Sequence, residues 1–144
     1  MMIKKDVKIN LTNDISNGKN TEKYSSEQIG KAIIINNILY LKYNESDAPF
    51  FPVIFKINNT NIKLKRGNQK TNSHFIMEFN NKKPTLSYYY TPYGKIFFKV
   101  KTNKIFFKLK NSPLSGMLKL KYQLFDYNEI VGNYKLVLYF KELS

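Results

Sequence analysis

The sequence contains no cysteine, no tryptophan, one histidine (His74) and one arginine (Arg66). Without cysteine the chain forms no disulfide, and it offers no thiolate for a zinc site or an iron–sulfur cluster. A single histidine also excludes any metal site built only from imidazole ligands. We therefore expect no metal and no cofactor, and a fold that depends on its own hydrophobic core.

Long apolar runs are also missing. The N-terminal stretch MMIKKDVKIN carries charges and lacks the apolar segment of a signal peptide. No window approaches the roughly 18 consecutive apolar residues that a transmembrane helix needs. These absences predict a cytoplasmic protein without a transmembrane segment, and the length of 144 residues predicts a single domain over residues 1–144. Nothing in the sequence indicates an oligomeric state.

Acidic residues are scarce, since 10 Asp and Glu stand against 24 Lys and Arg, for a net charge of +14. The excess is uneven: residues 1–50 hold 7 Lys and 6 acids, whereas residues 51–144 hold 17 basic residues and 4 acids. Such asymmetry favours a surface that faces a polyanion. Codon usage in an A/T-rich genome would produce the same abundance of Lys, Asn, Ile, Tyr and Phe, so composition leaves both explanations open.

What the sequence does contain is alternation of apolar and polar residues with a period of two, which is typical of β-strands. Glycine and proline fall between most of the alternating segments. Segment 14–28 is polar, and we predict a flexible loop or a weak strand there. The predicted strands cover 3–11, 29–35, 38–44, 52–58, 61–66, 73–79, 85–91, 94–101, 104–110, 116–125 and 133–140.

Short connections between these strands favour a meander of sequential hairpins. The Asn36-Asn37 pair suits a two-residue hairpin turn, because asparagine tolerates a positive φ. Gly132 lies just inside the last strand and is a candidate β-bulge. Closing the meander removes exposed edges, so we predict an all-β fold: a single closed antiparallel barrel of about 8–10 strands.

The stretch KIFFKVKTNKIFFKLK, residues 95–110, nearly repeats itself. We predict a hairpin with Thr102-Asn103 in the turn, in which Val100 opposes Ile105 and Phe98 opposes Phe107 inside the barrel. Lysine and phenylalanine side chains would then share the outer face. That face could bind phosphates and stack bases, or it could be an ordinary solvated strand face. The candidate polyanion-binding residues are Lys95, Phe97, Lys99, Phe106, Lys108 and Lys110.

A ligand inside the barrel is the leading hypothesis. Arg66 has the parity of Ile62 and Leu64, so it points to the core side at the end of its strand, unless the strand has already ended and Arg66 lies in water. At a barrel mouth its guanidinium could bind a carboxylate or phosphate. Tyr88 and Tyr90 share the parity of Leu86 and are predicted to point inward. The candidate ligand-binding residues are Arg66, Tyr88, Tyr90 and Tyr93.

Catalytic chemistry has little support in the sequence. His74 and Glu78 share a strand face but would lie about 13 Å apart along it, too far for a direct hydrogen bond. The sequence contains no phosphate-binding glycine loop and no nucleophile elbow. We therefore expect no catalytic residues and no enzyme, with a hydrolase that uses His74 as a remote alternative.

Two stretches resemble a known family. One is Tyr90-Thr91-Pro92-Tyr93-Gly94 followed by an alternating strand, and the other begins at Gly116 and alternates through Tyr122 towards Asn133. Together with Gly30 and the YNES segment at 43–46, they resemble the YwiB-like family of uncharacterised bacterial proteins. The resemblance implies a calycin-type, lipocalin-like closed barrel of eight or more strands. Calycin barrels often bind small apolar ligands, which is an analogy at the level of the fold.

We therefore expect a non-enzymatic barrel that binds a small apolar or anionic ligand in its interior. The alternative is sequence-nonspecific binding of nucleic acid or another polyanion through the outward Lys/Phe face.

Overall fold

The computed structural model describes residues 2–68, 70 and 73–143. This part of the chain contains ten strands and no helix, so it has no helix that could cross a membrane. The predicted all-β class is confirmed. The strands are β1 (Met2–Asn17), β2 (Asn20–Ile35), β3 (Ile38–Asn44), β4 (Pro52–Ile57), β5 (Asn61–Arg66), β6 (His74–Asn80), β7 (Thr85–Thr91), β8 (Gly94–Asn111), β9 (Leu114–Asp126) and β10 (Glu129–Glu142).

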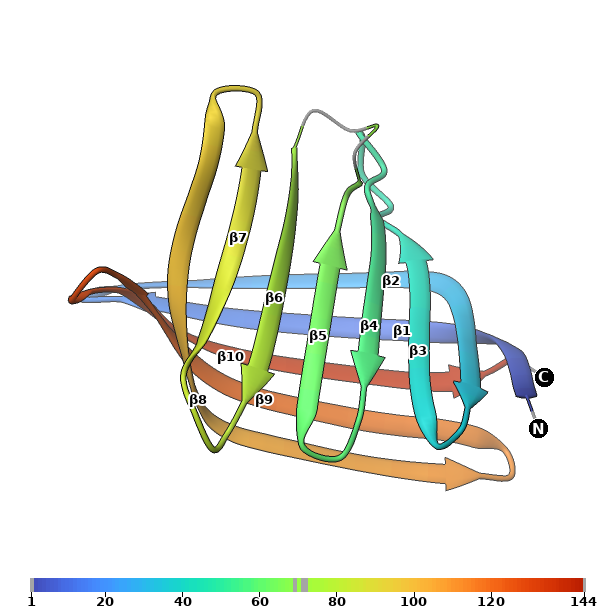
Figure 1. Ribbon diagram of the computed structural model, residues 1–144. Coiled ribbons are helices and arrows are strands. Elements are labelled where there is room, and N and C mark those ends of the chain that lie inside the picture. The colour runs from blue at the N-terminus through green and yellow to red at the C-terminus, as the bar shows by residue number, and fades with distance from the viewer. Residues whose placement is uncertain (1, 69, 71–72, 144) are drawn as a thin grey trace.

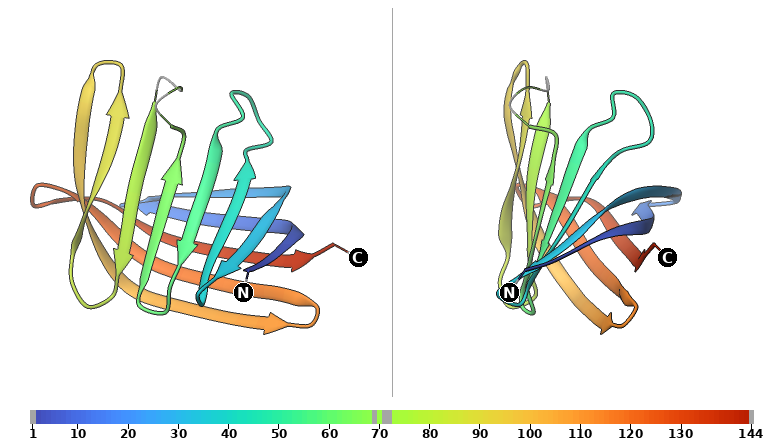
Figure 2. Two further views of the ribbon diagram at one scale, coloured as in Figure 1. Left: turned by 45° about the vertical axis from the view of Figure 1, so that its right-hand side comes forward. Right: turned by 90° about the vertical axis from the view of Figure 1, so that its right-hand side faces the viewer.

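The ten strands form one closed antiparallel barrel. Each strand pairs with its neighbours in sequence, and β1 also pairs with β10, which closes the sheet. In Figure 1 the strands β3–β7 stand upright in front, while β1, β2, β9 and β10 run crosswise behind them. Figure 2 shows the same two layers from other sides, with β8 bending from one layer into the other. The predicted closed meander is confirmed.

The core fills the half of the barrel nearest the β2–β3 turn. Asn36 and Asn37 form that turn with φ values of 51° and 64°, as predicted. Packing is tight around Gly116, where an added Cβ would lie 2.4 Å from Cε1 of Phe140. The largest fully buried side chains are Phe55, Phe79, Phe140, Ile9, Leu41, Ile57, Ile62, Leu118, Leu120, Leu138, Val7 and Val100.

Residues 95–110 are a single strand, so the predicted hairpin is wrong. The first part of β8, Gly94 to Val100, pairs with β7, and the part from Lys99 onward pairs with β9. A register shift between Thr102 and Lys104 stands where the turn was expected. Both a turn and a one-residue bulge shift the alternation of inward-facing and outward-facing residues by one position. The sequence pattern therefore fits both, and the repeat is one long strand that changes its partner.

Of the two alternatives predicted at 14–28, the loop is wrong and the strand is confirmed. β1 and β2 remain paired up to Asn17 and Asn20, with Gly18 at φ 63° in the turn between them. Apart from Gln28, which is buried, the side chains in this segment are exposed or only half buried, since they lie beyond the packed core. Backbone pairing of two 16-residue strands maintains this hairpin without the apolar alternation that would have revealed it.

The substitution Thr102→Asp tests the single strand. Thr102 is 6% exposed, so a carboxylate there would be buried without a partner. We expect the free energy of unfolding to fall by about 3 kcal/mol or more. Asn103→Asp, at the exposed neighbouring position, should change it by less than about 0.5 kcal/mol. Urea denaturation measures both, and equally small effects would support the hairpin, whose turn exposes both residues.

Candidate ligand-binding site

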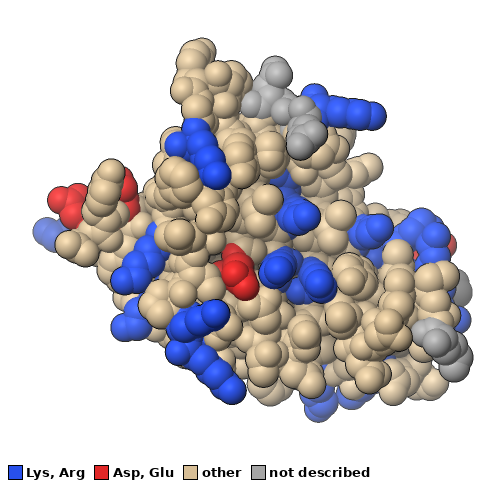
Figure 3. Space-filling view, viewed as in Figure 1, with Lys and Arg blue, Asp and Glu red and all other residues tan. Residues whose placement is uncertain are grey.

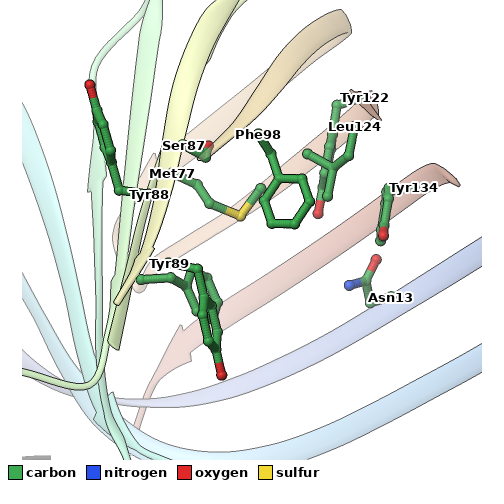
Figure 4. A pocket seen from close by; sticks show the side chains of 10 residues that line it. Asn13, Met77, Ser87, Tyr88, Tyr89, Phe98, Tyr122, Leu124 and Tyr134 are labelled. Atoms are coloured by element: carbon green, nitrogen blue, oxygen red, sulfur yellow. The ribbon is translucent and has the colours of Figure 1, made fainter. Parts of the chain in front are cut away.

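The barrel is hollow at the end that carries the β1–β2, β3–β4 and β7–β8 connections, which we call the open end. One cavity there has a volume of about 240 Å³. Its walls are mainly apolar and aromatic, and they come from β1 and from β6 to β10 (Figure 4). The lining residues are Asn13, Phe75, Met77, Ser87, Tyr88, Tyr89, Phe98, Tyr122, Leu124 and Tyr134.

Two buried polar atoms on this wall have no hydrogen-bond partner among the described residues, Ser87 Oγ and Asn13 Oδ1. Ser87 is only 3% exposed, so water reaches its hydroxyl poorly. An unpaired buried polar group costs about 1–3 kcal/mol. Native structures contain few of them, and each calls for an explanation such as a bound water, ion or ligand. A bound molecule could satisfy both atoms.

Two of the phenols that line the cavity, those of Tyr122 and Tyr134, have raised pKa values. Burial raises the pKa of Tyr122, the neighbouring Tyr134 raises it further, and a hydrogen bond with Asn13 partly opposes the shift. Burial also raises the pKa of Tyr134, whose ring stacks on Tyr122 with centroids 4.9 Å apart. No Lys, Arg, Asp or Glu is among the residues that line this cavity. The arrangement therefore suits an uncharged molecule.

A second cavity of about 370 Å³ shares Asn13 with the first and lies against β2, β3 and the loop after β3. Arg66 lines it and donates two hydrogen bonds to Glu45, from Nε to Oε2 at 2.7 Å and from Nη2 to Oε1 at 2.8 Å. The guanidinium also lies 4.5 Å from the ring centroid of Phe51. These hydrogen bonds raise the pKa of Arg66, and the cation is already compensated by a carboxylate of its own chain.

The comparisons with known proteins bear on this barrel. A family described as "Domain of unknown function (DUF1934)" matches residues 9–138. The chain belongs to the DUF1934 family. It also matches the crystal structure of the YwiB protein from Bacillus subtilis with a TM-score of 0.83 and 15% identity, covering 98% of this chain and 94% of that chain. The predicted YwiB-like membership is confirmed, and at this identity the likeness shows the fold alone. No curated protein matches the chain.

In this DUF1934 member, the predicted ligand-binding tyrosines lie mostly outside the cavity. Leu86 is 54% exposed whereas Ser87 is 3% exposed, so the inner face of β7 carries Ser87. The prediction that Tyr88 and Tyr90 point inward is therefore wrong. It assumed that the apolar Leu86 faces the interior and assigned every second residue after it to the same face, whereas Leu86 is exposed. The ring of Tyr88 points away from the other labelled side chains in Figure 4, although the residue borders the cavity. Tyr93 is 99% exposed in the β7–β8 turn.

The six candidate polyanion-binding residues do not form the compact patch that the hairpin would give. All six lie one after another along the single strand β8. At its ends, Lys95 lies opposite Tyr90 of β7 and Lys110 lies opposite Ser115 of β9. At about 3.4 Å per residue the two lysines are roughly 50 Å apart along the strand. The predicted two-strand Lys/Phe face is wrong, because the lysines at the two ends of β8 face different neighbours.

His74 and Glu78 have separate partners. The imidazole stacks on the ring of Tyr90 with centroids 4.4 Å apart, and Glu78 accepts a hydrogen bond from Asn61 at 2.8 Å. Among the described residues there is no group of three or more side chains that could hold a metal ion. The structure therefore brings no acid–base pair together at His74.

Sequence reasoning missed the polar residues of the cavity, Asn13, Ser87, Tyr122 and Tyr134. A signal was present for Tyr122. Tyr122 follows Leu118 and Leu120 on the inner face of β9, and all three are buried. The inner residues of β9 change from leucine to tyrosine at this point, and the tyrosine hydroxyl marks the boundary between the packed core and the cavity. Ser87 gave no such signal, since a serine beside an exposed leucine looks like a solvent-facing residue.

Tyrosine ionisation should destabilise the protein in alkali. The pKa values of Tyr122 and Tyr43 are raised in the folded state, chiefly by burial, whereas tyrosine in an unfolded chain titrates near pH 10. Between these pKa values only the unfolded state loses the proton, so stability is constant below about pH 10 and falls above it. Urea denaturation at about pH 9 and pH 11 measures the loss.

Tyr122→Phe should reduce that loss, and Tyr93→Phe, at the exposed turn, should leave it unchanged. If both variants lose the same stability between the two pH values as the unmodified protein, Tyr122 does not hold its proton in the fold.

Proposed function

We propose that this DUF1934 member is a non-enzymatic protein that binds a small, uncharged, mainly apolar molecule in the 240 Å³ cavity of its barrel. One observation carries the proposal: apolar and aromatic walls surround two buried polar atoms without partners, Ser87 Oγ and Asn13 Oδ1. A ligand with one hydrogen-bond donor would satisfy Asn13 Oδ1 and bury its apolar part against the rings.

The cavity limits the ligand to a compact molecule. At about 30 Å³ per water molecule it has room for roughly eight waters. Its 240 Å³ volume lies just below the range of about 300–1,000 Å³ that drug-sized ligands occupy. A single six-membered ring with a polar substituent is of suitable bulk, and a long-chain lipid is not.

The contacts of Arg66 favour an uncharged ligand over an anionic one. An anion would have to displace Glu45 from two hydrogen bonds of 2.7 and 2.8 Å. Tyr122 and Tyr134 support a binding role without catalysis, since phenols with raised pKa values are poor acids and bases near pH 7. A cytoplasmic location stays a prediction.

The test uses phenol, indole and benzoate as probes. Native mass spectrometry of freshly purified protein looks for a molecule retained from the cell, and ligand-observed NMR measures probe binding. We expect phenol or indole to bind and benzoate to bind at least tenfold more weakly. Equal binding of benzoate would overturn the preference for an uncharged ligand.

Two variants of Ser87 test the place of binding. Ser87→Leu fills the cavity and should abolish phenol binding. Ser87→Ala keeps the space and should weaken binding about fivefold, the cost of one hydrogen bond of about 1 kcal/mol. Leu124→Phe fills the cavity from the opposite wall and serves if Ser87→Leu does not fold. Unchanged binding to a folded, cavity-filled variant would place the ligand elsewhere and overturn the proposal.

A further inference from the structure

The outer face of β3–β8, which we call the front face, carries lysines and rings in rows across the strands. The central row consists of Lys42, Ile54, Lys65, Ile76, Tyr88 and Phe97, each opposite the next on a neighbouring strand. With adjacent strands about 4.8 Å apart, six strands give this row a length of roughly 24 Å. Its apolar and aromatic side chains lie between basic ones.

The rings at one end of this row are held in place. The Nζ of Lys95 lies 4.4 Å from the ring centroid of Tyr88, 5.2 Å from that of Tyr90 and 5.0 Å from that of Phe97. Tyr88 and Phe97 also meet edge to face, with centroids 5.2 Å apart. Phe97 is nevertheless 49% exposed, so a flat ligand can reach it. Fixed rings lose little freedom on binding, which favours stacking.

The front face is also hollowed. A groove of about 450 Å³ extends from Tyr40 to Tyr88, and another of about 480 Å³ extends from Lys95 to Tyr127. The two share Leu86, which is 54% exposed. They therefore meet beside the ring cluster and give an elongated site across the strands.

Positive charge dominates this face. The lysines that line the two grooves are Lys42, Lys56, Lys63, Lys65, Lys95 and Lys99. Within the described residues the ion pairs lie elsewhere on the barrel, so these six lysines have no carboxylate at ion-pair distance. Figure 3 shows basic groups spread over the face with an acidic group among them near the middle of the view. Glu78 and Asp126 also line the grooves, so six lysines stand against two carboxylates and the face keeps a net positive charge.

From this arrangement we propose that the front face binds single-stranded nucleic acid without sequence preference. Lysines neutralise successive phosphates, and unpaired bases stack on Phe97 and Tyr88, which is the combination that single-strand binding requires. A duplex keeps its bases stacked inside and would use only the lysines. A second copy of this chain would bring like charges together. A twisted strand row suits a linear polymer better than a flat bilayer.

The site lies on the outer face of the sheet and the cavity on the inner face, with Tyr88 and Phe98 bordering hollows on both sides. The first experiment measures fluorescence anisotropy of labelled 12-nucleotide mixed-sequence RNA and DNA at about 50 and 200 mM salt. Five phosphate contacts on a single strand predict a loss of affinity of about a hundredfold between the two salts. Absence of binding at the lower salt overturns the proposal.

Charge reversal locates the contact. The pair Lys56→Glu and Lys65→Glu removes two lysines of the front face, and the matched control, Lys119→Glu with Lys121→Glu, changes the net charge equally on β9. We expect the front-face variant to lose at least tenfold in affinity and to lower the salt slope by about 1.4. The control should stay within about twofold. Equal losses in both variants would show diffuse attraction and overturn the site.

Ring substitutions separate stacking from charge. Tyr88→Leu and Phe97→Leu keep an apolar side chain and should each weaken single-strand binding about tenfold with an unchanged salt slope. Duplex DNA of the same length should bind more weakly than the single strand. Equal duplex affinity, insensitivity to both ring variants, or preferential binding to phosphatidylserine vesicles would each overturn the assignment to single strands.

Discussion

Pairing of β1 with β10 is the contact on which the rest of the structure depends. The two strands run antiparallel from Val7 opposite Glu142 to Ser16 opposite Asn133, and this ladder turns an open meander into a barrel. Closure leaves no free strand edge to pair with another chain. It also creates an interior, so every strand must present one face to the core and the other to solvent. Binding sites of two different kinds then become possible on one sheet.

Closure does not require the whole interior to be filled. Large side chains pack the half nearest the Asn36-Asn37 turn, where Phe79 and Phe140 are fully buried. Towards the open end, polar and small residues such as Ser87 and Asn13 interrupt an apolar and aromatic inner wall, and a cavity lies between these residues. A sheet of long strands can be stabilised by its packed half alone. The hollow half is then free to carry polar atoms that would be costly within the core.

The sequence predicts the barrel well and the site poorly, for reasons that differ between residues. Alternation identifies inner positions in β3–β6, because most of the apolar residues there face inward, with Ile54 and Ile76 as exceptions on the outer face. The bulge at Thr102 inverts parity as a turn would, so Ile105 and Phe107 were assigned to the inner face through a wrong pairing. The Arg66–Glu45 contact spans 21 positions, and a local pattern holds no information about it.

β7 shows how the backbone divides the inner site from the outer one, although Tyr88 borders both. Along this strand Ser87 faces the cavity while the ring of Tyr88 packs against Phe97 and beneath Lys95 on the outside. Adjacent residues of a strand face opposite sides, so the backbone itself separates a neutral, apolar environment from a cationic one. The lysines outside leave the phenols inside neutral, and a ligand inside need not alter the charge outside. A strongly basic composition is therefore compatible with an uncharged ligand, because the two properties reside on opposite faces of the sheet.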